Sequence, residues 1–106
     1  MELVVMVYDL TKSFPKEEIY GLSSQLRRAA VSVPSNISEG AAGRSTDQFR
    51  NFLGIAIGSL NEINTQLEIA QRIGYLNERT ASDAQSLVDE CLALTYGLRK
   101  TLTHGQ

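Results

Sequence analysis

The chain has 106 residues, of which 42% are hydrophobic and 21% are charged, and its formal net charge is −2. This length and composition are typical of one globular domain, so we expect residues 1–106 to form a single domain. The near-neutral charge excludes proteins whose overall positive charge attracts nucleic acid or acidic membranes. The one cysteine excludes an internal disulfide and, with no signal peptide or membrane-spanning run, predicts a cytoplasmic protein.

The first segment, residues 3–14, has apolar residues that suit either a strand or a helix. Its valines favour a strand by intrinsic propensity. Its apolar residues also recur at the helical intervals of four, three and four: Leu3, Val7, Leu10 and Phe14. Because no other segment offers a partner strand, we predict a helix, followed by a longer connection around residues 15–21.

A second helix is predicted from about residue 22 to residue 41, and it contains a proline. Its apolar positions follow helical spacing: Leu22, Leu26, Ala29, Ala30, Val33, Ile37 and Ala41. Pro34 lies inside this pattern, where its ring removes one backbone donor and crowds the carbonyl of Ala30. We therefore predict a kink at Pro34.

A third helix, over residues 46–73, has the clearest pattern. Ser45 is the expected N-cap, and Gln48 three residues later completes the spacing of a capping box. The apolar stripe alternates steps of four and three: Phe49, Leu53, Ala56, Leu60, Ile63, Leu67, Ala70 and Gly74. This period is typical of a helix that packs against other helices.

A fourth helix is predicted after Asn77, its expected N-cap. We expect its core stripe to be Ala84, Leu87, Cys91, Leu94, Leu98 and Leu102. Residues 103–106, which include the only histidine, His104, are expected to fray. Because short connections make neighbouring helices antiparallel, the prediction is an all-α, antiparallel, up-down-up-down four-helix bundle with its second helix kinked at Pro34.

The third helix carries more apolar surface than one seam requires. Further apolar residues lie off the main stripe: Phe52, Ile55, Ile57, Ile69 and Ile73. A helix that is apolar on more than one face is buried on more than one side. Gly54 and Gly58 would let another backbone approach closely, either inside the bundle or between subunits. We predict a subunit interface at Phe52, Gly54, Ile55 and Gly58.

The sequence offers no catalytic or metal-binding constellation. His104 lies in the tail, and Cys91 is expected to be a buried structural thiol. Ser13 and Lys16 have the spacing of serine–lysine enzymes, but Pro15 lies between them and no second motif supports catalysis. We predict a protein that is not an enzyme and has no metal, no cofactor and no membrane partner.

Four basic residues are candidates for nucleic-acid contact: Arg27, Arg28, Arg44 and Arg50. If the helix ends that carry them converge, they form a basic patch able to meet phosphates. The alternative is that they pair with acids such as Glu39 or Asp47 or with acids of another subunit. The sequence shows no platform of stacked tyrosine or phenylalanine residues interleaved with these arginines.

Three blocks of sequence are distinctive: SSQLRRAAVSVPSNISEG at residues 23–40, LTKSFP at residues 10–15 and GSLNE at residues 58–62. Together they resemble the bacterial four-helix bundle proteins known as intervening-sequence proteins, named for insertions in large-subunit ribosomal RNA genes. The residues on the family's motif are Arg28, Pro34, Asn36, Glu39 and Gly40. The resemblance brings no catalytic role to these positions.

The resemblance implies a ring-like homopentamer of four-helix bundles. It also implies kinship with the accessory protein of diversity-generating retroelements, which binds a reverse transcriptase and nucleic acid. The chain departs from the family pattern in two ways. It opens inside the first helix, which predicts that this helix is short. It is also slightly acidic, whereas the relatives that bind nucleic acid are strongly basic. Two hypotheses stay open: a homo-oligomeric scaffold or adaptor for an unknown protein partner, and an RNA- or DNA-binding accessory protein that repeats a basic patch around a ring.

Overall fold

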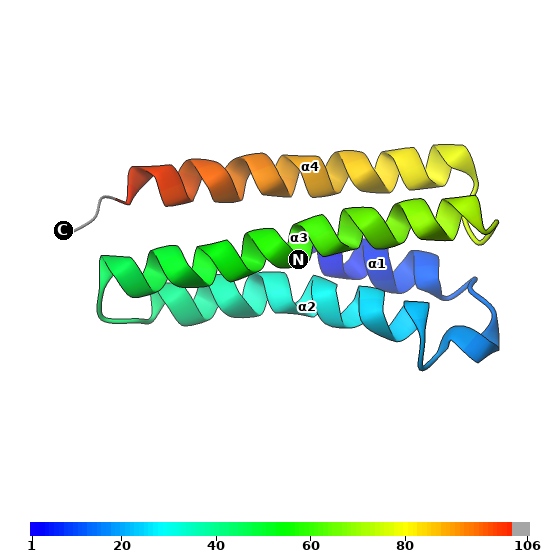
Figure 1. Ribbon diagram of the computed structural model, residues 1–106, viewed down its shortest axis with the longest axis horizontal. Coiled ribbons are helices and arrows are strands. Elements are labelled where there is room, and N and C mark those ends of the chain that lie inside the picture. Colours follow the sequence, from blue (N-terminus) through cyan, green and yellow to red (C-terminus); the bar gives the residue numbers. More distant parts are fainter. Residues whose placement is uncertain (103–106) are drawn as a thin grey trace.

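The computed structural model describes residues 1–102, which form four helices and one short helical turn. The elements are α1 (Glu2–Thr11), η1 (Lys16–Glu18), α2 (Leu22–Ala41), α3 (Thr46–Arg72) and α4 (Glu78–Thr101). Figure 1 shows the helices side by side, with α2 and α4 running opposite to α1 and α3. The predicted all-α four-helix bundle is confirmed. His104 and the expected fraying at residues 103–106 lie outside the described residues.

The two long helices α3 and α4 begin where the sequence places their caps. The Ser45 hydroxyl accepts a hydrogen bond from the Gln48 backbone N–H at 3.0 Å. The Asn77 side chain accepts one from the Thr80 N–H at 2.7 Å. Only half of the capping box forms, because the Gln48 side chain accepts from the Arg44 N–H rather than from that of Ser45. Both predicted N-caps are confirmed.

The core lies around α3, which packs against both α2 and α4, while α1 contacts α2 and, less extensively, α4. Fully buried side chains come from all four helices: Val7, Leu26, Leu53, Leu60, Ile63, Leu67 and Val88. Burial of one side chain of this size contributes about 1.5–3 kcal/mol. The predicted stripe of α3 is therefore the centre of the core from Leu53 to Ala70.

The predicted core stripe of α4 is wrong in its second half. Leu94 and Leu98 are 75% and 39% exposed. The buried face instead carries Ala81, Ala84, Val88 and Thr95. The reason is the shortness of α1, which has 10 residues beside the 24 of α4 and starts near the middle of the bundle (Figure 1). Beyond that start, α1 does not cover the face of α4 that carries the two leucines.

Helix α2 continues through Pro34 from Leu22 to Ala41, and the kink at Pro34 stays a prediction. Two residues after the proline, the Asn36 amide donates to the carbonyl and the hydroxyl of Ser32, both at 2.8 Å. The Ser32 hydroxyl is also 2.9 Å from the Ser59 hydroxyl of α3. These contacts tie the middle of α2 to α3.

The connection between α1 and α2 docks onto the loop between α3 and α4. The buried ring of Phe14 lies 5.3 Å from the Tyr75 ring, measured between centroids. The Tyr75 hydroxyl donates to the Glu18 carboxylate at 2.7 Å, and the Leu22 N–H donates to the same carboxylate at 3.0 Å. The Leu22 and Tyr75 hydrogen bonds hold the pKa of Glu18 below its ordinary value, while the bond to Glu18 raises the pKa of Tyr75.

Candidate functional site

The four candidate arginines do not gather in one place. Arg27 and Arg28 lie in the first half of α2, whereas Arg44 lies in the loop that follows α2. The helix between Arg28 and its last residue, Ala41, is about 20 Å long at the helical rise per residue. Within one copy of the chain, the structure therefore brings Arg27 and Arg28 together and leaves Arg44 at the other end of the helix.

Arg50 has a structural role that its sequence context does not indicate. Its Nη1 donates to the carbonyl oxygens of Arg99 and Leu102, at 2.9 and 2.7 Å. These carbonyls belong to the last turn and cap of α4, where backbone acceptors are short of helical partners, although the Arg99 carbonyl also accepts from the Leu102 N–H at 3.1 Å. The positive charge also suits the negative end of the helix dipole. Arg50 is thus a C-terminal cap supplied by another helix.

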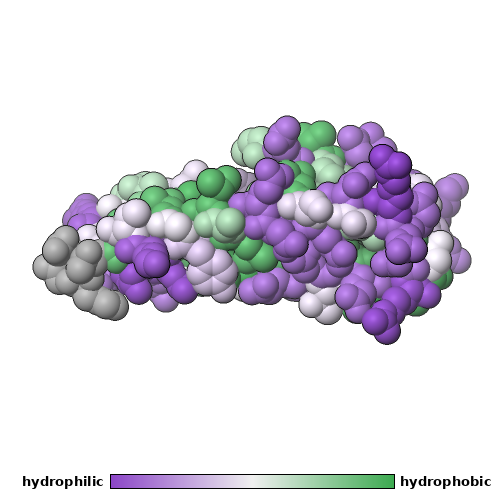
Figure 2. Space-filling view, turned by 90° about the horizontal axis from the view of Figure 1, so that it is seen from above, coloured by the Kyte–Doolittle hydropathy of each residue, from purple (hydrophilic) through white to green (hydrophobic). Residues whose placement is uncertain are grey.

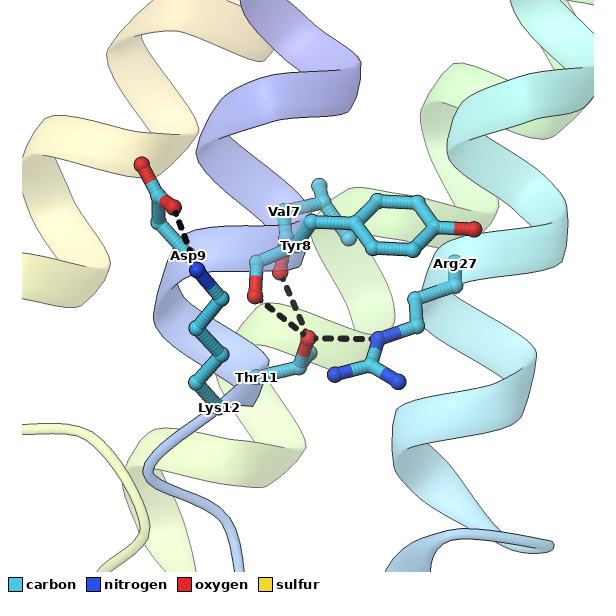
Figure 3. A network of polar contacts seen from close by, with 6 residues as sticks. All are labelled: Val7, Tyr8, Asp9, Thr11, Lys12 and Arg27. Carbon is cyan, nitrogen blue, oxygen red and sulfur yellow. Dashed lines mark hydrogen bonds and ion pairs between the residues drawn. The ribbon is translucent and has the colours of Figure 1, made fainter.

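Arg27 is held in place by α1, as Figure 3 shows. Its Nε donates to the Thr11 hydroxyl at 2.9 Å, and that hydroxyl donates to the Val7 carbonyl at 2.7 Å. The guanidinium carbon lies 5.0 Å from the centroid of the Tyr8 ring, within range of a cation–π interaction. Because Thr11 is buried, this network fixes the position of the Arg27 guanidinium.

Arg27 and Arg28 line a surface hollow of about 530 Å³ between α1 and α2, here called the basic hollow. The other lining residues are Tyr8, Ile19, Ser24, Val31 and Ser32. No carboxylate lines the hollow, and neither arginine forms an ion pair within residues 1–102. Two unpaired guanidinium groups beside hydroxyls and an aromatic ring suit a ligand with phosphate and a flat apolar part.

Sequence reasoning missed Tyr8 as a member of this hollow. Tyr8 precedes Arg27 by 19 positions in the chain, so no local pattern connects the two. The contact exists because α1 packs antiparallel against the start of α2, which places Tyr8 beside Arg27. The fold thus places an aromatic ring beside Arg27, although no aromatic residue is its near neighbour in the sequence.

The predicted interface residues of α3 divide into two groups. A Cβ at Gly58 would meet no atom within 4 Å, and one at Gly54 would meet only the Arg99 side chain, at 3.6 Å. Ile55, between them, is 46% exposed. Gly54, Ile55 and Gly58 therefore form an open surface on α3, here called the glycine face, and are not a tight contact inside the bundle.

Phe52 belongs instead to the contact between α2 and α3. A Cβ at Gly40 would lie 2.8 Å from the Phe52 Cβ and 2.9 Å from the Phe49 Cδ1. Glycine at position 40 thus allows the end of α2 to approach α3 closely. Phe52 is half-buried by this packing, so its side chain supports the fold more than it offers a free surface.

The bundle is similar to known proteins in both sequence and structure. Residues 1–97 match the family described as 23S rRNA-intervening sequence protein. The chain belongs to this family. A crystal structure of a protein of unknown function from the S23 ribosomal protein family of Bacteroides thetaiotaomicron is similar, with a TM-score of 0.86 and 26% identity over 93% of each chain. No curated protein matches the chain.

The motif residues by which the sequence resembles the family of intervening-sequence proteins do not form one site. Arg28 and Glu39 are exposed, Pro34 and Asn36 are half-buried, and Gly40 is buried. Asn36 and Gly40 join α2 to α3 through the contacts described above. Two of the five motif residues therefore have structural roles in this family member, and Arg28 lines the basic hollow.

The remaining candidates for chemistry are also separated. The Ser13 hydroxyl donates to the Leu10 carbonyl at 2.9 Å rather than to Lys16. Cys91 is half-buried, and burial raises the pKa of its thiol. Within residues 1–102, no three histidine, cysteine or acidic side chains are grouped closely enough to hold a metal ion. In the same range, no helix has the length and hydropathy needed to span a membrane.

Proposed function

We propose that the protein is a non-catalytic, homo-oligomeric scaffold or adaptor of the cytoplasm, whose assembled copies present a surface to a protein partner. The observation that supports this proposal is the open glycine face of α3, where Ile55 is exposed beside two glycines. A glycine in the middle of a helix costs about 0.5–1 kcal/mol relative to alanine. Two of them on an exposed face are useful where another backbone packs closely.

Apolar side chains elsewhere on the surface favour the same proposal. Those at least 40% exposed include Tyr8, Val31, Ile69 and Ile73. Contiguous exposed apolar patches mark interaction sites, and burial of apolar surface contributes about 25 cal/mol per Å² to association. A stable interface buries about 800 Å² on each partner. The ring-like pentamer implied by the motif resemblance is part of this proposal, since head-to-tail contacts between identical copies close into rings.

Light scattering and native mass spectrometry at micromolar concentration test the assembly. We expect the wild-type protein to be a defined oligomer and the Ile55→Glu variant to be a smaller species with unchanged helical content. Ile19→Glu is the matched control, because Ile19 is 52% exposed in the connection between α1 and α2. A monomeric wild-type protein contradicts the proposal.

A second candidate function is RNA or DNA binding, and the basic hollow favours it. The fixed Arg27, the exposed Arg28 and the Tyr8 ring offer charge and a stacking surface to a single strand. Repetition of the hollow around a ring would strengthen weak binding by each copy through multivalency. The kinship with the retroelement accessory protein, implied by the resemblance, belongs to this second candidate.

Fluorescence anisotropy with a labelled oligouridine and with a duplex of equal length tests the second candidate. We expect the logarithm of affinity to fall linearly with the logarithm of salt concentration. Tyr8→Ala should weaken single-strand binding more than duplex binding, and Arg28→Ala should reduce the salt dependence, whereas the exposed control Arg79→Ala should change neither. Absence of binding at low salt removes this candidate.

A further inference from the structure

A groove of about 900 Å³ lies between α1 and α4. Its apolar lining comes from both helices and includes Val5, Met6 and Leu10 of α1 and Ala84 and Leu87 of α4. Val5 is 59% exposed at its edge, and the small side chain of Ala84 is buried. The groove exists because α1 packs closely against α2 and only loosely against α4.

The apolar surface continues along α4 past the start of α1. Leu94 and Leu98 follow Leu87 and Cys91 at steps of three and four residues, so all four share one side of the helix. From Leu87 to Leu98 this side extends for about 17 Å, or about three helical turns. Figure 2, viewed from the α4 side, shows apolar surface along the half of the molecule that holds the C-terminus of α4. The long, narrow shape suits a helix better than a compact small molecule.

The rim of the groove is acidic. Within residues 1–102, the lining contains the carboxylates of Glu2, Asp9 and Asp83 and no lysine or arginine side chain. Asp9 lies 3.5 Å from the Lys12 ammonium and Asp83 lies 3.9 Å from the Arg79 guanidinium. Lys12 and Arg79 therefore offset part of the charge of Asp9 and Asp83, although neither cation lines the groove, and the carboxylate of Glu2 adds to the negative charge of the rim.

We propose that this groove binds an amphipathic helix of a partner protein, with its apolar side on α1 and α4 and lysine or arginine residues beside the acidic rim. The inference rests on the adaptor part of the proposed function and names the chemistry of the partner. Apolar residues spaced along one helix face fill a groove of this kind, and cations that flank them meet its carboxylates. Met6 and Met1 adapt their shape to different apolar side chains.

The test uses two labelled synthetic peptides of about four helical turns, which present leucines along one face. One peptide carries lysine and the other glutamate at all remaining positions. We expect wild-type protein to bind the lysine peptide at least about tenfold more tightly than the glutamate peptide. Added salt should weaken binding of the lysine peptide. The double substitution Asp83→Asn and Glu2→Gln should also weaken this binding.

A matched pair of variants locates the binding. Val5→Glu should weaken the lysine peptide by about tenfold although it adds negative charge, because it removes an apolar wall of the groove. Val31→Glu makes the same substitution at a valine that is 41% exposed on α2 and should leave binding unchanged. Equal binding by the two variants, or equal binding of the two peptides, overturns the proposal.

Light scattering on the same proteins separates this inference from the scaffold proposal. A change of subunit number in Val5→Glu assigns the groove to a contact between copies and overturns the partner helix as its occupant. Intact peptide binding by a wild-type protein that is monomeric overturns the scaffold alone and leaves the groove assignment standing.

Discussion

Two glycines show that the surroundings of a residue decide how its replacement by alanine changes the stability of the fold. A Cβ at Gly40 would lie within 3 Å of Phe49 and Phe52, whereas a Cβ at Gly97 would meet nothing within 4 Å. We therefore expect Gly40→Ala to lower the free energy of unfolding by about 1–3 kcal/mol through overpacking. Gly97→Ala should raise it by about 0.5–1 kcal/mol, because alanine is the better helix former. Urea denaturation measures both, and an unchanged Gly40→Ala protein contradicts the close approach of α2 and α3.

Glu18 makes the free energy of unfolding depend on pH in the acidic range. Its pKa is lowered in the folded state by the hydrogen bonds from Leu22 and Tyr75, so its contribution is present above the unfolded pKa. That contribution is lost as pH falls through the folded pKa. Urea midpoints measured between neutral and acidic pH should therefore fall less in Glu18→Gln than in the wild type. Glu17→Gln, the neighbouring exposed control, should follow the wild type.

Individual site residues were only partly predictable from the sequence. Arg27 and Arg28 were identified because adjacent arginines stand out in a helix with small and apolar neighbours. Tyr8 and the capping role of Arg50 were not, since each depends on a partner far along the chain. A local pattern has no access to such contacts, which arise when helices pack.

At the level of elements, Arg50 connects the start of α3 to the end of α4. Loss of its two hydrogen bonds would leave the Arg99 and Leu102 carbonyls without this partner. We expect Arg50→Ala to lower the free energy of unfolding by about 1.5–3 kcal/mol, the range for hydrogen bonds to charged groups. Hydrogen exchange should also become faster in the last turn of α4. Arg44→Ala, an exposed control in the neighbouring loop, should have little effect on either measurement.

The helices differ in how well their sequences predict their buried faces. α3 was predicted closely, because Ser45 marks its start and one stripe of large residues follows a constant period. α4 has two adjacent stripes, and the leucine-rich one is the more exposed toward its end. The inward face is set by Ala81, Ala84, Val88 and Thr95, whose small side chains allow α4 to pack against α3. Hydrophobicity alone favours the wrong stripe where a neighbouring helix is short.

For the molecule as a whole, the bundle measures 47 × 24 × 18 Å and leaves apolar side chains exposed on all four helices. If copies associate through the glycine face, their stability is linked to concentration by mass action. We expect the thermal unfolding midpoint of the wild type to rise when protein concentration is raised about a hundredfold. In Ile55→Glu the midpoint should be nearly independent of concentration, as in a monomer. A concentration-independent wild type would argue against assembly.

The brevity of α1 divides the bundle into a four-helix end and a three-helix end, with few contacts holding α1 to α4. Elements with sparse packing open without global unfolding. In amide exchange, α1 should therefore lose its protection while α2 and α3 keep theirs. The α1–α4 groove borders this element, so a ligand bound in the groove would hold α1 against α4. We therefore expect bound ligand to slow amide exchange along α1.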